Sequence, residues 1–210
     1  MDDHDYGLNN AGVDNPVKDF NKRLFLEAME EPADSVRWQE GRGLFEDYVI
    51  THKEKKIHIV LLDGRYYMEP DRKKNAAFLG EEQWRWLEGI FATTQSDLYL
   101  IGSGVQFLQN YRWETEGWHR HEKKRFLDLV QKYRKNNLIF LSGDIHFLQF
   151  YRSICPLGGS AGYYLYEATS SGLSHVATDY IPFADHFTTF KSSRSYPISK
   201  LESLLNFGTI

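Results

Sequence analysis

Segments with helical periodicity alternate with short apolar runs along this 210-residue chain. The helical patterns span residues 14–32, 79–95 and 119–137, and the strand-like runs span residues 43–67, 97–104, 138–146 and 162–175. Helices that alternate with apolar strands favour an α/β fold in which the strands are buried. The alternation is imperfect, so we expect a mixed sheet, and the length suits a single domain over residues 1–210.

Individual side chains refine this expectation. The run at 43–67 has a polar turn at 52–56 between two β-branched and aromatic stretches, which predicts a β-hairpin. We expect residues 138–141 to form a central, buried strand with residues 98–101 beside it. Apolar stripes predict the buried faces of the three helices: Phe20, Leu24 and Met29; Trp84, Leu87 and Phe91; Phe126, Leu127, Val130 and Tyr133.

Composition excludes several classes of protein. The net charge of −4 gives no basic field for binding nucleic acid. Cys155 is the single cysteine, which excludes an intramolecular disulfide and a cysteine-rich zinc site. No apolar run approaches the roughly 20 residues needed to span a membrane, and the first residues lack the apolar core of a signal peptide. The compartment and the oligomeric state stay open.

The apolar run at 138–146 ends in a candidate metal site. Asp144 and His146 follow Gly143 at spacing i, i+2, which places two side chains on one face of an extended backbone, while Ile145 points into the core. Open α/β sheets place ligands at the carboxyl ends of their strands, and carboxylate with imidazole suits a divalent or trivalent metal. A turn aspartate beside an unrelated histidine explains the same pattern.

Two further clusters have two interpretations each. Asp2, Asp3 and Asp5 surround His4, and adjacent carboxylates indicate either a bound cation or a solvated chain end. A histidine flanked by acids holds its proton more tightly, as a general acid should. Arg65 follows a strand, where it can clamp an anionic oxygen or form a structural salt bridge with Asp63.

Two glycine motifs are weaker signals. Residues 158–162 match the G-x-S-x-G pattern of serine hydrolases, but a loop precedes Ser160 and a strand-like run follows it. A nucleophilic serine of this kind needs a strand before it and a helix after it, so we expect no serine hydrolase. Residues 102–104, Gly-Ser-Gly, lack the pattern of a nucleotide-binding loop and predict a plain turn.

Taken in order, five segments resemble the PhoD-type alkaline phosphatases, a branch of the calcineurin-like metallophosphatase superfamily. These segments are DDHDYGLNNAG, LLDGRYY, LGEEQWRWLE, LIFLSGDIH and YEATSSGLSH, from residue 2 to about residue 175. The resemblance implies a ββ sandwich flanked by helices, with metal ions at strand ends. It also implies hydrolysis of phosphate mono- or diesters with a small phosphate ester as substrate.

The resemblance implies a role for each candidate residue. Asp3, Asp144 and His146 would hold divalent or trivalent ions (Fe, Ca, Zn or Mn), with Asp2 as the alternative to Asp3. His4 would protonate the leaving group, and Asp5 would orient His4. Arg65 would lie near the substrate phosphate.

The chain also departs from the family pattern. In the family, a strand, a tryptophan, an earlier metal ligand and a metal-bridging aspartate precede the Asp-Asp-His motif. The sequence therefore resembles the C-terminal half to two-thirds of such a domain, truncated at the N-terminus. We expect a thin or absent second sheet, an exposed apolar patch, and weak or no turnover. The alternative is a non-catalytic remnant or binding module of the same fold.

Overall fold

A single mixed β-sheet organises the molecule. The computed structural model describes residues 2–70, 75–108, 117–155, 163–173 and 195–197. The strands are β1 (Glu46–His52), β2 (Lys55–Leu61), β3 (Leu98–Ser103), β4 (Leu138–Ser142), β5 (Leu148–Cys155), β6 (Tyr163–Ser170) and β7 (Ser195–Pro197). The helices are α1 (Asp3–Tyr6), α2 (Lys18–Ala28), the 3₁₀ turn η1 (Val36–Trp38), α3 (Gly80–Thr93) and α4 (Arg120–Lys132).

The strand order is β1-β2-β3-β4-β6-β5-β7. Strands β2, β3, β4 and β6 run parallel, whereas β1 and β5 run antiparallel to their neighbours β2 and β6. Strand β4 is the middle strand and β3 lies beside it, as the sequence predicts. The predicted hairpin is β1–β2, with His52 opposite Lys55. The α/β class and the mixed sheet are therefore confirmed, while β5 and β7 were not predicted as strands.

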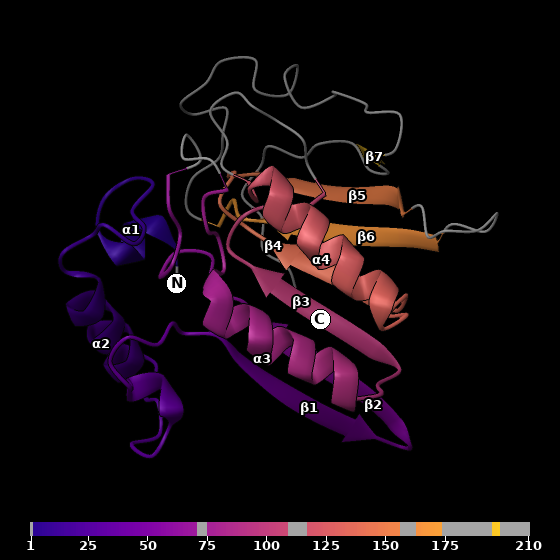
Figure 1. Ribbon diagram of the computed structural model, residues 1–210, viewed down its shortest axis with the longest axis horizontal. Coiled ribbons are helices and arrows are strands. Elements are labelled where there is room, and N and C mark those ends of the chain that lie inside the picture. Colours follow the sequence, from indigo (N-terminus) through magenta and orange to yellow (C-terminus); the bar gives the residue numbers. More distant parts are fainter. Residues whose placement is uncertain (1, 71–74, 109–116, 156–162, 174–194, 198–210) are drawn as a thin grey trace.

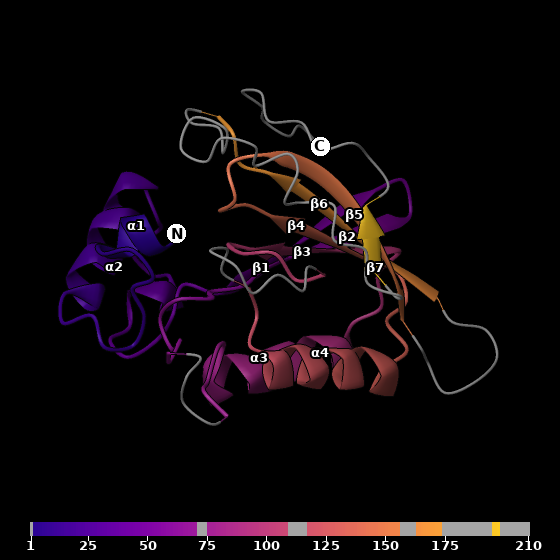
Figure 2. The same ribbon diagram turned by 90° about the horizontal axis from the view of Figure 1, so that it is seen from above.

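Helices α3 and α4 lie side by side against one face of the sheet (Figures 1 and 2). Their predicted stripes face this interface, where Trp84, Leu87, Phe91, Phe126 and Val130 are all buried. Aromatic rings fill much of the layer between helices and strands. The rings of Phe107 and Phe140 stack with centroids 4.2 Å apart. Ring pairs of this kind stabilise a core beyond the area that they bury.

Helix α2 is oriented differently from the prediction. Phe20, Leu24 and Met29, the expected buried stripe, are 54%, 48% and 60% exposed. The buried residues of α2 are Lys22 and Leu26. The Lys22 ammonium donates hydrogen bonds to the backbone carbonyls of Gln39 and Arg42. A fully hydrogen-bonded lysine can thus occupy an inner position, and the apolar stripe faces outward.

The sheet face opposite α3 and α4 carries an apolar surface. Its exposed side chains include Tyr48, Ile50, Leu61, Phe150, Ile154, Tyr164 and Tyr166. In the described part of the chain no helix covers this face (Figure 2), and the strands there belong to the one sheet. These exposed side chains agree with the expected apolar patch, and the expected thin or absent second sheet stays a prediction. The described helices also lack the length and apolar character needed to cross a bilayer.

The turn of the β1–β2 hairpin generates a prediction about stability. Lys53 and Glu54 form the two-residue turn with φ values of 47° and 65°. Such turns favour Asn-Gly, since a left-handed residue other than glycine costs about 1–2 kcal/mol. We therefore expect Lys53→Asn with Glu54→Gly to raise the free energy of unfolding by about 1 kcal/mol in urea titrations. Lys56→Gly, in the adjoining strand, is the matched control and should lower it by roughly 0.5–1 kcal/mol; an unchanged double variant would contradict the expectation.

Candidate metal centre

Polar residues meet where three neighbouring parallel strands end. Arg65 follows β2, Gly104 follows β3 and Asp144 follows β4. Helix α1 lies beside this end of the sheet (Figures 1 and 2). Because the carboxyl ends of parallel strands share one edge, this is where an open α/β sheet binds ligands.

Three carboxylates converge at this edge. Asp2, Asp3 and Asp144 each place an oxygen within 4.8 Å of the other two. Asp3 is buried, whereas Asp2 and Asp144 are partly buried. The predicted approach of Asp3 to Asp144 is thus present in the structure, and Asp2 joins them, so that the sequence alternatives Asp2 and Asp3 lie in the same cluster. Carboxylate oxygens at this spacing fit a hard cation such as Ca²⁺, Mg²⁺ or Mn²⁺.

The local conformation of residues 2–7 holds two of these carboxylates in place. Asp2 caps the one-turn helix α1, and its own N–H donates to Asp5 Oδ2 at 2.9 Å. The Asp3 carboxylate accepts the backbone N–H groups of His4 at 2.8 Å and Asn10 at 2.9 Å. The side chains of Asp2 and Asp5 together form a capping box, which satisfies open N–H groups at the start of the helix. The opening acidic cluster is therefore an ordered turn rather than a solvated end.

Tyr6 anchors this turn to the rest of the molecule. Its side chain is fully buried and meets the ring of Tyr66 edge to face, with centroids 6.5 Å apart. The Tyr6 carbonyl accepts hydrogen bonds from the side chains of Asn15 and Asn21. Burial, reinforced by the nearby Asp63 carboxylate, raises the pKa of Tyr6 far above its ordinary value, so the phenol stays neutral.

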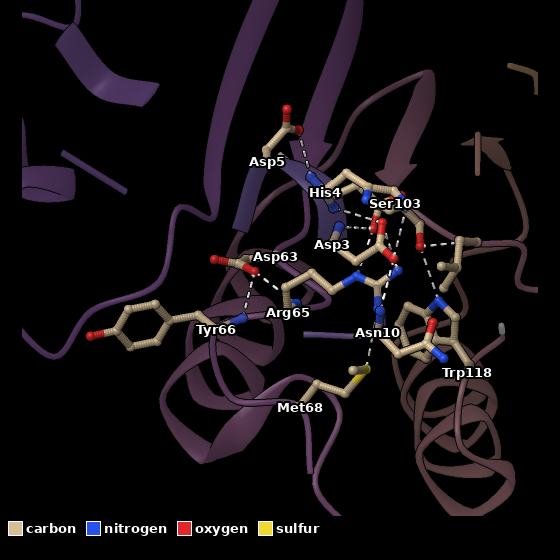
Figure 3. Close-up of polar contacts among 12 residues, drawn as sticks. Asp3, His4, Asp5, Asn10, Asp63, Arg65, Tyr66, Met68, Ser103 and Trp118 are labelled. Carbon is tan, nitrogen blue, oxygen red and sulfur yellow. Dashed lines mark hydrogen bonds and ion pairs between the residues drawn. The ribbon is translucent and has the colours of Figure 1, made fainter. Parts of the chain in front are cut away.

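Arg65 supplies the positive charge of the cluster. The residue is only 1% exposed, and its Nε donates to Asp2 Oδ1 at 2.6 Å. Its Nη2 lies 4.0 Å from Asp3 Oδ1. Figure 3 shows the guanidinium extending to the carboxylate of Asp3. The buried cation therefore joins the loop after β2 to helix α1, 63 residues away in sequence.

Asp63 does not form the salt bridge with Arg65 that the sequence allowed. Its Oδ1 accepts the backbone N–H groups of Arg65 and Tyr66, each at 2.9 Å, and its Oδ2 accepts the N–H of Leu44 at 2.8 Å. Figure 3 shows the Asp63 carboxylate directed at this backbone. Asp63 thus shapes the turn after β2 and leaves the guanidinium directed at Asp2 and Asp3.

The geometry predicted for Asp144 and His146 is wrong in one respect. Both residues have positive φ, 72° and 56°, and both lie in a loop after β4 rather than in an extended segment. The i, i+2 rule for extended backbone therefore does not apply. Ile145 is buried, as predicted. His146 does not belong to the group of described residues whose oxygens meet within 4.8 Å, so its role as a ligand stays a prediction.

His4 and Asp5 are arranged differently from the expectation. The His4 side chain is 76% exposed, and its Nε2 lies 3.9 Å from Asp3 Oδ2. The Asp5 carboxylate accepts the N–H of Asp2 in the helix cap instead of holding the imidazole. In the described chain, the carboxylate recorded near the His4 ring is therefore that of Asp3.

The loop after β3 completes the edge. A Cβ on Gly104 would come within 3.2 Å of all three atoms of the Asp2 carboxyl group, so this position admits no side chain without displacing Asp2. The Gly104 carbonyl accepts the N–H of Gly143 at 3.0 Å, which joins the loops after β3 and β4. The plain turn predicted at residues 102–104 is wrong, because Gly102 and Ser103 end strand β3 and only Gly104 lies beyond it. A close backbone approach to a carboxylate leaves no signal in sequence.

A buried glutamate fixes the continuation of this loop. Glu167, on β6, accepts the backbone N–H groups of Phe107 and Leu108, each at 2.7 Å. Burial raises the pKa of Glu167, although these two hydrogen bonds act in the opposite direction. The polar contacts continue from Gln106 Nε2 to Thr169 Oγ1 at 2.8 Å and from there to Ser142 Oγ at 2.8 Å. Ser160, the serine of the G-x-S-x-G pattern, lies outside the described residues.

Comparison with known proteins identifies the fold. No family model matches the sequence, and no curated relative matches it. The structure of PhoD aligns with a TM-score of 0.65 and 17% identity over 81% of this chain and 38% of that chain. The structure of purple acid phosphatase PPD1 from yellow lupin (Lupinus luteus) seeds gives a TM-score of 0.43 and 14% identity over 79% and 27% of the two chains.

The likeness to PhoD shows that this chain shares the α/β fold of that structure over the aligned part. The chain spans 38% of the PhoD chain, so the activity of a whole phosphatase does not follow from the alignment. Membership of the PhoD-type family stays a prediction.

The ion pair between Arg65 and Asp2 generates a prediction about stability. We expect Arg65→Met and Asp2→Asn each to destabilise the fold, with a coupling energy of about 1–3 kcal/mol between them. The double variant should therefore lose less stability than the sum of the single variants, measured by urea unfolding in chelator. The pair Arg85→Met and Asp34→Asn, on other parts of the surface, should be additive. Additivity of the Arg65 and Asp2 effects would contradict the contact.

Asp144 generates a prediction in which the free energy of unfolding and the affinity for cations change in opposite directions. Its φ of 72° favours glycine, and its carboxylate adds negative charge beside Asp2 and Asp3. We expect Asp144→Gly to raise the free energy of unfolding in chelator by about 1 kcal/mol and to weaken cation binding at the same time. Gly143→Ala, in the same loop, is the backbone control and should not raise stability. A destabilised Asp144→Gly protein that binds cations normally would contradict both expectations.

Proposed function

We propose that this chain carries cation-binding and phosphate-binding residues of a metal-dependent phosphoesterase that hydrolyses phosphate mono- or diesters. The observation that supports it is the meeting of Asp2, Asp3 and Asp144 at the carboxyl ends of parallel strands, beside the buried Arg65. The metallophosphatase-type fold makes the same chemistry plausible.

The charge of the cluster favours one divalent ion. Three carboxylates and one guanidinium leave a formal charge of −2, which a single divalent cation neutralises. An all-oxygen donor set suits Ca²⁺ or Mn²⁺ better than Zn²⁺, which prefers nitrogen and sulfur ligands. When bound, such an ion would act as a Lewis acid on a phosphoryl oxygen.

The chain's own residues supply the remaining roles. Arg65 contributes a fixed positive charge that would attract the phosphate group, as in other sites that transfer phosphoryl groups. His4, whose exposed imidazole lies 3.9 Å from the Asp3 carboxylate, would give a proton to a leaving oxygen. Asp5 holds the helix cap and thereby the position of Asp2, so we assign it a positioning role.

The second candidate function is a cation-binding module without turnover. It is favoured by the arrangement of His4, whose imidazole is largely exposed and lies 3.9 Å from the Asp3 carboxylate. A general acid is usually held within hydrogen-bond reach of its substrate and oriented by a partner. A site with cation and phosphate affinity but a poorly oriented acid would bind phosphate groups without cleaving them.

Cation binding is the first test of the proposal. We expect Mn²⁺, followed by the electron paramagnetic resonance of the unbound ion, to bind one site per chain. Asp2→Asn, Asp3→Asn and Asp144→Asn should each weaken binding about tenfold or more, which corresponds to ~1.4 kcal/mol. Asp34→Asn, an exposed carboxylate elsewhere, should have no effect. His146→Ala decides whether this residue is a ligand. Absence of Mn²⁺ binding would overturn the proposal.

Turnover distinguishes the two functions. The substrates are bis-p-nitrophenyl phosphate, whose leaving group needs little protonation, and phenyl phosphate, whose leaving group needs more. We expect slow Mn²⁺-dependent hydrolysis that Asp144→Asn abolishes. If His4 is the acid, His4→Ala should reduce phenyl phosphate hydrolysis far more than hydrolysis of the nitrophenyl ester, and His52→Ala should change neither. Binding of Mn²⁺ and phosphate without turnover would establish the binding module instead.

A further inference from the structure

Strand β1 forms an unprotected edge of the sheet. It is the first strand in the strand order, and no other described strand pairs with its outer side. Its seven residues pair with β2 in consecutive register without a bulge, and its sequence, EDYVITH, contains neither proline nor lysine. Tyr48, Val49 and Ile50 are each about half exposed. Natural proteins usually protect an edge strand with bulges, proline or charged side chains, because an open edge pairs with other strands. Charged carboxylates stand only at the start of β1, and residues 48–51 carry none of these devices.

The turn determines which backbone groups of β1 point outward. In a hairpin with a two-residue turn, the flanking residues His52 and Lys55 form a hydrogen-bonded pair, and such pairs then recur at every second residue. The N–H and C=O groups of Asp47, Val49 and Thr51 are consequently directed away from β2. In agreement, the Asp47 N–H donates to the Glu46 side chain at 3.1 Å.

We propose that β1 is a homodimer interface, at which β1 of a second copy of this chain adds antiparallel about a two-fold axis at Val49. In this register the two Val49 residues exchange backbone hydrogen bonds with each other. Asp47 of each copy pairs in the same way with Thr51 of the second copy. The Asp47 N–H then donates to that Thr51 instead of to the Glu46 side chain. The arrangement is isologous, so it closes as a dimer.

The side chains of β1 are complementary to themselves in this register. Glu46 of one copy lies opposite His52 of the second copy, which joins the acidic start of the strand to its basic end. Tyr48 lies opposite Ile50 of the second copy, an aromatic and β-branched pair of the kind that stabilises antiparallel strands. No like charges face each other. This complementarity to itself is the reason to expect a second copy rather than an unrelated strand.

The predicted dimer is weak because a seven-residue strand offers a small contact. Interfaces below about 1,200 Å² belong to transient complexes. We therefore expect a concentration-dependent equilibrium between the 24.6 kDa monomer and a dimer in sedimentation velocity. At high protein concentration the amides of Asp47, Val49 and Thr51 should exchange with deuterium more slowly than at low concentration. The proposal is independent of the metal centre.

Proline substitutions test the edge. Val49→Pro removes an N–H that faces outward, so it should abolish the dimer and leave the monomer folded. Ile50→Pro removes an N–H that bonds β2, so it should lower the stability of the monomer itself. A dimer that persists in folded Val49→Pro would overturn the proposal, as would a chain that stays monomeric with rapid exchange at the three amides at every concentration.

A charge exchange tests the register without altering the backbone. Glu46→Lys places a cation opposite His52 of the second copy and should weaken the dimer several-fold. Adding His52→Glu restores opposite charges in the same register, so the double variant should recover the dimer. Glu27→Lys, on the exposed surface of α2, raises the net charge by the same amount and should have no effect. Failure of the double variant to recover the dimer would overturn the assigned register.

Discussion

The buried guanidinium of Arg65 is the charge on which the candidate site depends. A cation at 1% exposure must be neutralised inside the protein, since transfer of an unpaired charge from water is strongly unfavourable. Asp2 provides that neutralisation at 2.6 Å, and the contact holds helix α1 against the strand ends. Asp63 takes part indirectly, because it binds the backbone of Arg65 and directs the side chain to the carboxylates. Among the described residues, Arg65 is the cation whose recorded contacts join the acidic turn at residues 2–5 to the sheet.

Local sequence patterns correctly predict the elements that bury one apolar face against a single layer of the core. The stripes of α3 and α4, with Trp84 and Phe126, face the sheet as expected, and the apolar run of β4 is its middle strand. The stripe of α2 fails because burial depends on the surface opposite the helix. There, two backbone carbonyls accept the Lys22 ammonium, and Phe20 faces outward. Periodicity identifies an amphipathic helix but does not identify its buried face.

The candidate site was only partly predictable for a related reason. Asp144 follows from its place after a buried strand, and Asp3 from the resemblance to a family motif. The ion pair between Arg65 and Asp2 joins residues 63 positions apart. Residue 104 is a glycine without a side chain at the point where the Asp2 carboxyl group approaches the backbone. Neither contact has a local pattern. The geometry predicted for Asp144 and His146 was wrong because it assumed extended backbone at residues whose φ values are positive, while the role of His146 as a ligand stays a prediction.

The same geometry links stability to cation binding. Asp144 has a backbone conformation that glycine adopts more easily, and its carboxylate meets two others beside a single positive charge. Both features oppose folding in the absence of a cation, since strain and like charge are present together. A cation that binds only the folded chain stabilises it by RT ln(1 + [L]/Kd), about 2.7 kcal/mol at a hundredfold excess over Kd. A cation bound at this cluster would therefore offset the like charge that Asp144 adds beside Asp2 and Asp3.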